Sequence, residues 1–277
     1  MSWVGRGILG LALVLAAVLA VRADDPVPEA PKDAKGYLQK AVKATVSQEG
    51  YHFSLKSSSQ AAAAAGGMAG GKGGGGPSGL DSKGISRKTG VVNLTDGGIG
   101  EIWMKGRKVL VKQNGQNEWK VPESLGPAGA AITRLLRTPN DIAEDMVRLA
   151  GSAKNDGEEK IEEIDCWVVG TVGDKAAIDA YVKQLRERAG GLATMFLGAA
   201  QFDTDKAELT YKAWIGKSDG FLYRIENKAN VPLKGGGNPL LGGGGGVDQS
   251  TTVDYLAYNT DLNTEVPAEV KRKLGIK

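Results

Sequence analysis

Few residues in this chain could carry catalytic chemistry. Its 277 residues include one His, His52, and one Cys, Cys166. Zinc sites need several His or Cys ligands, and a disulfide needs two Cys, so this composition excludes both within one chain. Most hydrolytic and redox chemistry that relies on such ligands is excluded with them. We therefore expect no metal and no other cofactor.

Two glycine-containing motifs match catalytic patterns but lack the context that the chemistry requires. Gly216-Lys217-Ser218-Asp219-Gly220 has the spacing of a nucleophile elbow, but a predicted strand follows the serine and His52 precedes it in the chain. The stretch 66–72 matches the beginning of a phosphate-binding loop, but Gly73 stands where a Ser or Thr would bind magnesium. We interpret the first motif as a hairpin turn and the second as a flexible loop.

We interpret the remaining reactive side chains as parts of the folded structure and not as catalytic groups. His52 occupies the polar side of an alternating segment and has no partner for general-base work. Cys166 lies beside Trp167 in an apolar strand, where burial raises the pKa of a thiol and makes it inert. Asp203-Thr204-Asp205 lacks the glycine and the distal glutamate of a calcium loop. We predict no enzymatic activity; an exported hydrolase is the least favoured alternative, because it needs a carboxylate pair that the sequence does not locate.

The N-terminus has the pattern of an export signal. Residues 8–21 are apolar or small, Arg6 precedes them, and Ala23 ends a site of the kind that signal peptidases cleave. The alternative is an uncleaved anchor, but a membrane span needs about 18 or more apolar residues. We predict a signal peptide over 1–23 and a soluble mature chain, periplasmic or otherwise exported. After this predicted cleavage the mature chain would begin at Asp24, and it would have no N-terminal Cys for lipid attachment.

Charge and composition set the organisation of the mature chain. It carries 33 basic and 32 acidic residues, so it presents no basic field for nucleic acid. Three prolines in 24–32 predict an extended tether, and the apolar content of the chain, 41%, supports a single domain over 33–277. Two tracts rich in Gly, 61–79 and 235–246, are interpreted as loop insertions between neighbouring strands.

Hydrophobic periodicity predicts an α+β fold. Helices are expected around Leu38, Val42 and Val46 with Gly50 as the cap, over 128–151 with a cap at Thr138, from Asp174 to Gly190, and after Pro267. Strands are expected around 51–56 and over 99–105, 108–113, 116–121, 160–172, 207–215, 221–231 and 251–259. Together they indicate an open, strongly curved antiparallel sheet, or half-barrel, with helices covering one mouth.

Hydrophobic and aromatic side chains are the remaining functional candidates. The four tryptophans of the mature chain, Trp103, Trp119, Trp167 and Trp214, all lie on predicted strands. A curved apolar sheet that helices cover only in part leaves room for a cavity, and such cavities hold acyl chains. Ordinary core packing is the alternative for each residue, and alternation alone does not tell which face points inward. The cavity candidates are Phe53, Leu55, Ile102, Leu110, Trp214 and Leu222, and the helical lid candidates are Ile142 and Met146.

The sequence also resembles a known family. Tyr211-Lys212-Ala213-Trp214-Ile215, followed by the segment 219–225, resembles a strand pair of the LppX/LprG-type lipid-binding proteins, which are related in fold to the periplasmic lipoprotein carrier LolA. The segment 162–170, the ending 253–267 and the N-terminal helix with its following strand are similar as well. The resemblance implies a LolA-like half-barrel around a hydrophobic cavity that binds lipid or an acylated protein without chemistry. The missing lipobox Cys and the two glycine tracts depart from that pattern.

These observations favour an exported, non-catalytic carrier or binding protein of the bacterial envelope. Its expected partner is a lipid acyl chain or a lipoprotein, and transient contact with a membrane is compatible with this role; no nucleic acid is expected. The alternative is an envelope stress sensor or scaffold of the same fold, which binds a protein partner and no lipid. A monomer is expected in either case.

Overall fold

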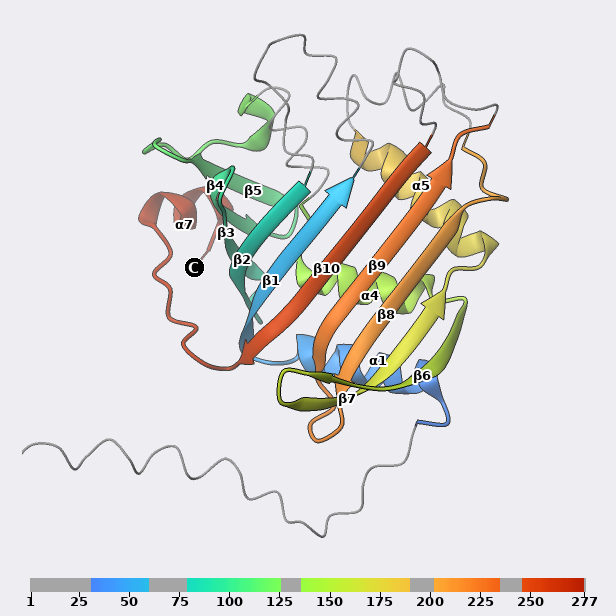
Figure 1. Cartoon of the computed structure of the whole chain (residues 1–277). Coiled ribbons are helices and arrows are strands. Elements are labelled where there is room, and N and C mark those ends of the chain that lie inside the picture. Colours follow the sequence, from blue (N-terminus) through green and yellow to red (C-terminus); the bar gives the residue numbers. More distant parts are fainter. Residues whose placement is uncertain (1–30, 60–78, 126–135, 190–201, 235–245, 277) are drawn as a thin grey trace, which may run out of the picture.

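All strands in the described part of the chain belong to one antiparallel sheet. The computed structural model describes residues 31–59, 79–125, 136–189, 202–234 and 246–276. Ten strands follow one another in the order β5-β4-β3-β2-β1-β10-β9-β8-β7-β6 (Figure 1). The strands are β1 (Gly50–Ser59), β2 (Gly79–Arg87), β3 (Val91–Asp96), β4 (Gly100–Lys105), β5 (Lys108–Gln113), β6 (Ser152–Ile161), β7 (Ile164–Val172), β8 (Glu208–Gly216), β9 (Leu222–Pro232) and β10 (Gly246–Tyr258). Because β5 and β6 at the two edges do not pair, the sheet is open, and the expected fold class is confirmed.

Helices cover one face of this sheet. The helices described are α1 (Ala34–Val46), α4 (Pro139–Leu149), α5 (Lys175–Ala189) and α7 (Ala268–Leu274), with a short 3-10 helix η1 (Pro122–Leu125). Figure 1 shows α1, α4 and α5 behind the half of the sheet that runs from β10 to β6, whereas α7 lies beside β4 and β5. We call the face toward α1, α4 and α5 the inner face.

The helices begin at the residues that cap them. The Asp33 carboxylate accepts a hydrogen bond from the N–H of Gly36 at 2.9 Å at the start of α1. Thr138 and Asp141 form a reciprocal capping box at the start of α4, with both hydrogen bonds at 3.1 Å, and Pro139 occupies the first turn. Asp174 accepts from the N–H three residues further on at 2.8 Å and so starts α5. The expected caps of α4 and α5 are confirmed.

Strand alternation places apolar side chains on the inner face. In β1, at the centre of the sheet, Tyr51, Phe53 and Leu55 are buried, whereas Lys56 and Ser58 are exposed. The same period of two runs along β8, β9 and β10, and it puts their apolar side chains into one core with the helices. The main core therefore lies between the inner face and the helical layer.

The predicted strand 116–121 is wrong. After the turn at Asn114 and Gly115 the chain makes a single bridge, between Val111 and Lys120, before η1 begins. Trp119 therefore lies off the sheet. It packs beside β4 and α7 in a small cluster on the outer face.

Two other predicted boundaries are wrong. The segment 160–172 is not one strand: it contains the end of β6, a turn and β7, and Glu162 in that turn has a φ of 53°. Gly50 does not cap α1, because Ser47 is the capping residue and its N–H bonds to a carbonyl of the last helical turn at 3.1 Å. Gly50 instead begins β1 and pairs with Arg87.

Several expected segments lie outside the described residues. They are the signal peptide over 1–23, the tether residues 24–30, the motif over 66–72, the helical residues 128–135 and both glycine tracts except for their last residues, Gly79 and Gly246. Gly79 pairs with Ser58, and Gly246 pairs with Pro232. Each tract therefore joins two strands that are neighbours in the sheet, and both connections leave from the same end of it.

Candidate functional site

The eight side chains expected to line or cover a cavity are all buried, but they belong to three clusters. Leu110 packs with Trp103 and α7 on the outer face. Trp214 packs with Cys166, and it faces outward because its neighbours on either side in β8 belong to the main core. Leu110 and Trp214 are therefore not part of the inner face. The six that meet in the main core are Phe53, Leu55, Ile102 and Leu222 from the sheet and Ile142 and Met146 from α4, each at most 1% exposed.

One apolar row crosses the inner face of five adjacent strands. Its members are paired in register from β7 to β1, and all belong to the main core with no exposed surface. Such a row is a continuous strip of hydrocarbon perpendicular to the strands. We call it the apolar row, and it consists of Val169, Ala213, Ile225, Val253 and Leu55.

A polar row lies beside the apolar row, two residues further along each of the same strands. Its members are also paired in register and are between 2% and 5% exposed. The hydroxyls of Ser57 and Thr251 are 3.1 Å apart, and the amide of Asn227 donates to the carbonyl of Thr210 at 3.2 Å. Five polar side chains on the buried face of a sheet are unusual, because each must find a hydrogen-bond partner. We call them the polar row: Thr171, Tyr211, Asn227, Thr251 and Ser57.

A charged cluster on the helical layer faces one end of the polar row. The Asp145 carboxylate of α4 accepts hydrogen bonds from both Arg137 and Arg148, one at each oxygen. Arg137 is 8% exposed and also donates to the carbonyl of Asp141 at 3.0 Å. These charges act on the Tyr211 hydroxyl, since Arg137, Asp145 and Arg148 all shift its pKa.

Three polar atoms at this place have no hydrogen-bond partner in the described part of the chain. They are Oη of Tyr211, Oγ1 of Thr171 and Nε of Arg137. Burial raises the pKa of Tyr211 to about 12, although the guanidinium of Arg137 lowers it. The Tyr211 hydroxyl is therefore neutral at physiological pH and available as a donor. The sequence analysis missed these residues, although the alternation of β7 and β8 already places Thr171 and Tyr211 on one face.

A cluster of tyrosines lies on the opposite side of the apolar row from the polar row. Tyr51, Tyr255 and Tyr258 pack together, with ring centroids 5.1 to 6.5 Å apart. Tyr51 hydrogen-bonds to Asn140, and Tyr255 donates to the carbonyl of Pro139 at 3.3 Å. These two bonds tie the first turn of α4 to β1 and β10.

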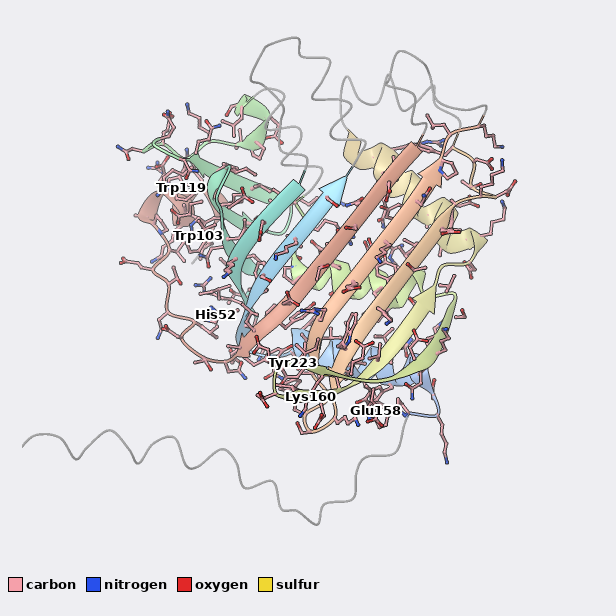
Figure 2. All side chains as sticks on the ribbon, in the orientation of Figure 1. His52, Trp103, Trp119, Glu158, Lys160 and Tyr223 are labelled. Atoms are coloured by element: carbon pink, nitrogen blue, oxygen red, sulfur yellow. The ribbon has the colours of Figure 1, made fainter. Side chains whose placement is uncertain are left out.

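The outer face carries a small cavity. It has a volume of about 190 Å³ and is mostly charged, with lining residues Glu158, Glu159, Lys160, Asp165, Cys166 and Lys217. Figure 2 shows Glu158 and Lys160 at the same end of the sheet as Tyr223. The cavity is smaller than most ligand pockets, which measure about 300 to 1,000 Å³. Glu158 and Lys217 form an ion pair there, and Lys217 also lies over the ring of Trp167.

The side chains considered for catalysis, Cys166 and His52, lie in surroundings that do not activate them. Burial raises the pKa of the Cys166 thiol to about 11, as expected for an inert cysteine. His52 lies 3.0 Å from the carbonyl of Thr260 and contacts no carboxylate in the hydrogen bonds described. Among the described residues, no group of three or more His, Cys, Asp or Glu could hold a metal ion. No helix described here is long and apolar enough to span a bilayer.

A buried thiol and two buried tyrosine hydroxyls predict that the protein loses stability at alkaline pH. Burial raises the pKa of Cys166 from 9.0 and that of Tyr211 from 10.0, and it also raises the pKa of Tyr255. The unfolded chain therefore releases these protons at lower pH than the folded chain. We expect these groups to make their whole contribution to the free energy of unfolding below about pH 9. That contribution should be lost between about pH 9 and pH 12. Urea unfolding at several pH values measures this; a constant free energy up to about pH 12 would contradict it.

Comparisons with known proteins find similarity at the level of structure only. No family model and no curated protein matches the sequence. Among solved structures, the lipoprotein LppX of Mycobacterium tuberculosis is 13% identical, with a TM-score of 0.45 over 84% of this chain and 98% of LppX. LprF of Mycobacterium bovis is 14% identical, with a TM-score of 0.44 over 87% of this chain and 99% of LprF. A LolA-superfamily protein of Nitrosomonas europaea is 13% identical, with a TM-score of 0.26 over 86% of this chain and 96% of that one.

Proposed function

We propose that this chain is an exported, non-catalytic carrier or binding protein that holds a lipid acyl chain, or the acyl group of a lipoprotein, between its sheet and its helices. The apolar row is the observation that supports this most. It crosses five strands, about 19 Å from first to last at ordinary strand spacing, and this is roughly the length of an acyl chain of fifteen carbons. Each methylene buried against it contributes about 0.8 kcal/mol, so affinity needs no polar recognition of the chain.

Entry of such a chain requires the helical layer to separate from the sheet. Phe53, Leu55 and Leu222 have no exposed surface, and so side chains of α1 and α4 occupy the space in front of them. Among the described residues, few hydrogen bonds join the two layers. Besides the two tyrosine bonds to α4, the hydroxyl of Thr45 accepts from the N–H of Leu222 at 3.0 Å, and Tyr181 of α5 donates to Gln249 at 2.9 Å. Contacts that are mainly apolar can be replaced by contacts with a hydrocarbon chain.

Native mass spectrometry of protein purified from its own host tests the proposal. We expect a retained mass that extracts into organic solvent as lipid, and uptake of a fluorescent fatty acid by the stripped protein. Leu55→Ala in the apolar row should weaken uptake about fivefold or more, since a methyl cannot replace the lost contact area. Trp214→Phe on the outer face is the control and should leave uptake unchanged. Protein without retained lipid or uptake would refute the proposal.

A scaffold or stress sensor with a protein partner is the second candidate. The observation that favours it is the complete burial of the six inner-face candidates, because a core filled by its own side chains has no need of a ligand. The same measurements separate the two functions. A protein that binds no lipid and is recovered from its host with a stoichiometric envelope protein has the second function.

A further inference from the structure

Three buried polar groups near one another have atoms with no hydrogen-bond partner in the part of the chain that the structure describes. Thr171 and Tyr211 are paired in register on β7 and β8, so their Cβ atoms are about 5 Å apart on the same face. The third donor, Arg137, lies on the helical layer close enough to act on the Tyr211 hydroxyl. The exposed fractions of these side chains are 3%, 2% and 8%. Their polar atoms are therefore shielded from bulk water.

We propose that Arg137, Tyr211 and Thr171 bind the carboxylate head of a fatty-acid-type ligand whose tail lies along the apolar row. This inference rests on the proposed function and adds the chemical class of the ligand. It assigns an anionic head group to one end of the site, in addition to the hydrocarbon that the apolar row would accept.

A single acceptor with several lone pairs could form hydrogen bonds with all three groups. The Nε–H of a guanidinium can only donate, whereas a neutral tyrosine or threonine hydroxyl can both donate one hydrogen bond and accept. A carboxylate has two oxygens with about four acceptor positions, so one carboxylate can accept from all three. A single water molecule accepts at most two hydrogen bonds and must then place its own two protons. Burying these donors without a partner is unfavourable.

The charge at the site favours an anion. The charged groups that act on Tyr211 are Arg137, Arg148 and Asp145, which together carry one net positive charge. Asp145 already uses one carboxylate oxygen for each arginine. One bound carboxylate would therefore neutralise the cluster and would make charge-assisted hydrogen bonds away from solvent, where they are strongest.

The position of the site suits a head group with a hydrocarbon tail. Thr171 and Tyr211 are two residues from Val169 and Ala213 on the same strands, so polar and apolar rows are about 7 Å apart. A ligand whose carboxylate lies at Tyr211 can thus turn its tail onto the apolar row within a few bonds. The tail would then run from β7 and β8 toward Leu55 in β1.

The test compares two ligands of equal length in the full chain, decanoate and decan-1-ol, by titration calorimetry. We expect decanoate to bind at least tenfold more tightly than decanol, because only decanoate carries the charge that the donors require. Tyr211→Phe and Thr171→Val should each weaken decanoate about threefold to tenfold and leave decanol unchanged. Arg137→Met should remove the preference. Tyr255→Phe is the matched control, because it deletes a buried tyrosine hydroxyl that already has a partner, and it should keep the preference.

A stability measurement separates binding from a structural role. Tyr211→Phe removes a hydroxyl without a partner, so the ligand-free protein should keep or gain free energy of unfolding. Removing a hydroxyl that makes a structural hydrogen bond would instead lower the free energy of unfolding. Such a loss, with the decanoate preference retained, would overturn the inference. This readout also holds if Arg137→Met fails to fold.

The outcomes distinguish the two proposals. Equal binding of decanoate and decanol would overturn the carboxylate site and leave the acyl-binding function standing. A decanoate preference that survives all three substitutions would place the head group elsewhere and would also overturn the inference. If neither ligand binds, the proposed function fails and the inference fails with it.

Discussion

Asp145→Asn will lower the free energy of unfolding by about 3 to 5 kcal/mol. The carboxylate of Asp145 is the common acceptor for Arg137 and Arg148, and Arg137 is only 8% exposed. An asparagine has almost the same shape but no charge, so the guanidinium of Arg137 would remain buried without its counter-ion. Removing one partner of a buried ion pair is much more costly than never having had the pair. Chemical denaturation at neutral pH measures the loss.

An exposed ion pair provides the control for this substitution. Asp205 pairs with Lys175, and both side chains are more than 60% exposed. Asp205→Asn should leave the free energy of unfolding almost unchanged, because water solvates whichever charge remains. If Asp145→Asn is as mild as Asp205→Asn, water reaches Arg137 and the cluster is not a buried one.

Phe53→Ala will cost about 3 to 5 kcal/mol of unfolding free energy in the ligand-free protein. Phe53 has no exposed surface and lies at the centre of the sheet, where it is paired with Tyr255 on one side and Gly84 on the other. Gly84 has no side chain, and a Cβ there would come within 2.1 Å of the Asn93 carbonyl oxygen. The neighbouring backbone therefore cannot supply atoms to fill the space that a truncated Phe53 leaves, and the cavity penalty adds to the lost transfer energy.

Leu256→Ala is the matched control for Phe53→Ala, since Leu256 in β10 is 52% exposed. It should cost less than about 0.5 kcal/mol. The ligand tests the interpretation further. If Phe53 borders an acyl chain, saturating fatty acid should recover part of the stability of Phe53→Ala, because the chain can fill the space. A loss below about 1 kcal/mol without ligand would show that Phe53 already faces an open space.

Strongly periodic segments were predictable from the sequence, and strands without clear alternation were not. The alternation at Tyr51, Phe53 and Leu55 and the caps at Thr138 and Asp174 are local signals, so β1, α4 and α5 follow from neighbouring residues alone. The strands β2, β3 and β6 were missed. β6 is a run of small and charged residues from Ser152 to Ile161 that lies at the sheet edge, and it becomes a strand because β7 offers it hydrogen bonds. Such pairing energy is not encoded in the residues of the strand itself.

For a related reason, only part of the candidate site could be predicted from the sequence. Apolar residues on strands could be listed, but alternation could not tell Leu55 on the inner face from Trp214 on the outer one, because that depends on where the helices lie. The polar row gave a weaker signal still. Tyr211 and Asn227 are ordinary strand residues until register places them side by side, and register is a property of two distant segments.

The place of β10 has a consequence for how the chain folds. Strands that follow one another in sequence pair with each other, except that β5 does not pair with β6. At the centre of the sheet β1 pairs with β10, and Tyr51 is the partner of Tyr258. The sheet thus consists of two meanders, β1 to β5 and β6 to β10, joined by one contact across about 200 residues. Contacts of such separation slow folding, because a long loop must close before they form. Until β10 has been synthesised, β1 has one unpaired edge that other strands can contact. The last strand to be synthesised, β10, is therefore the strand that joins the two halves of the sheet.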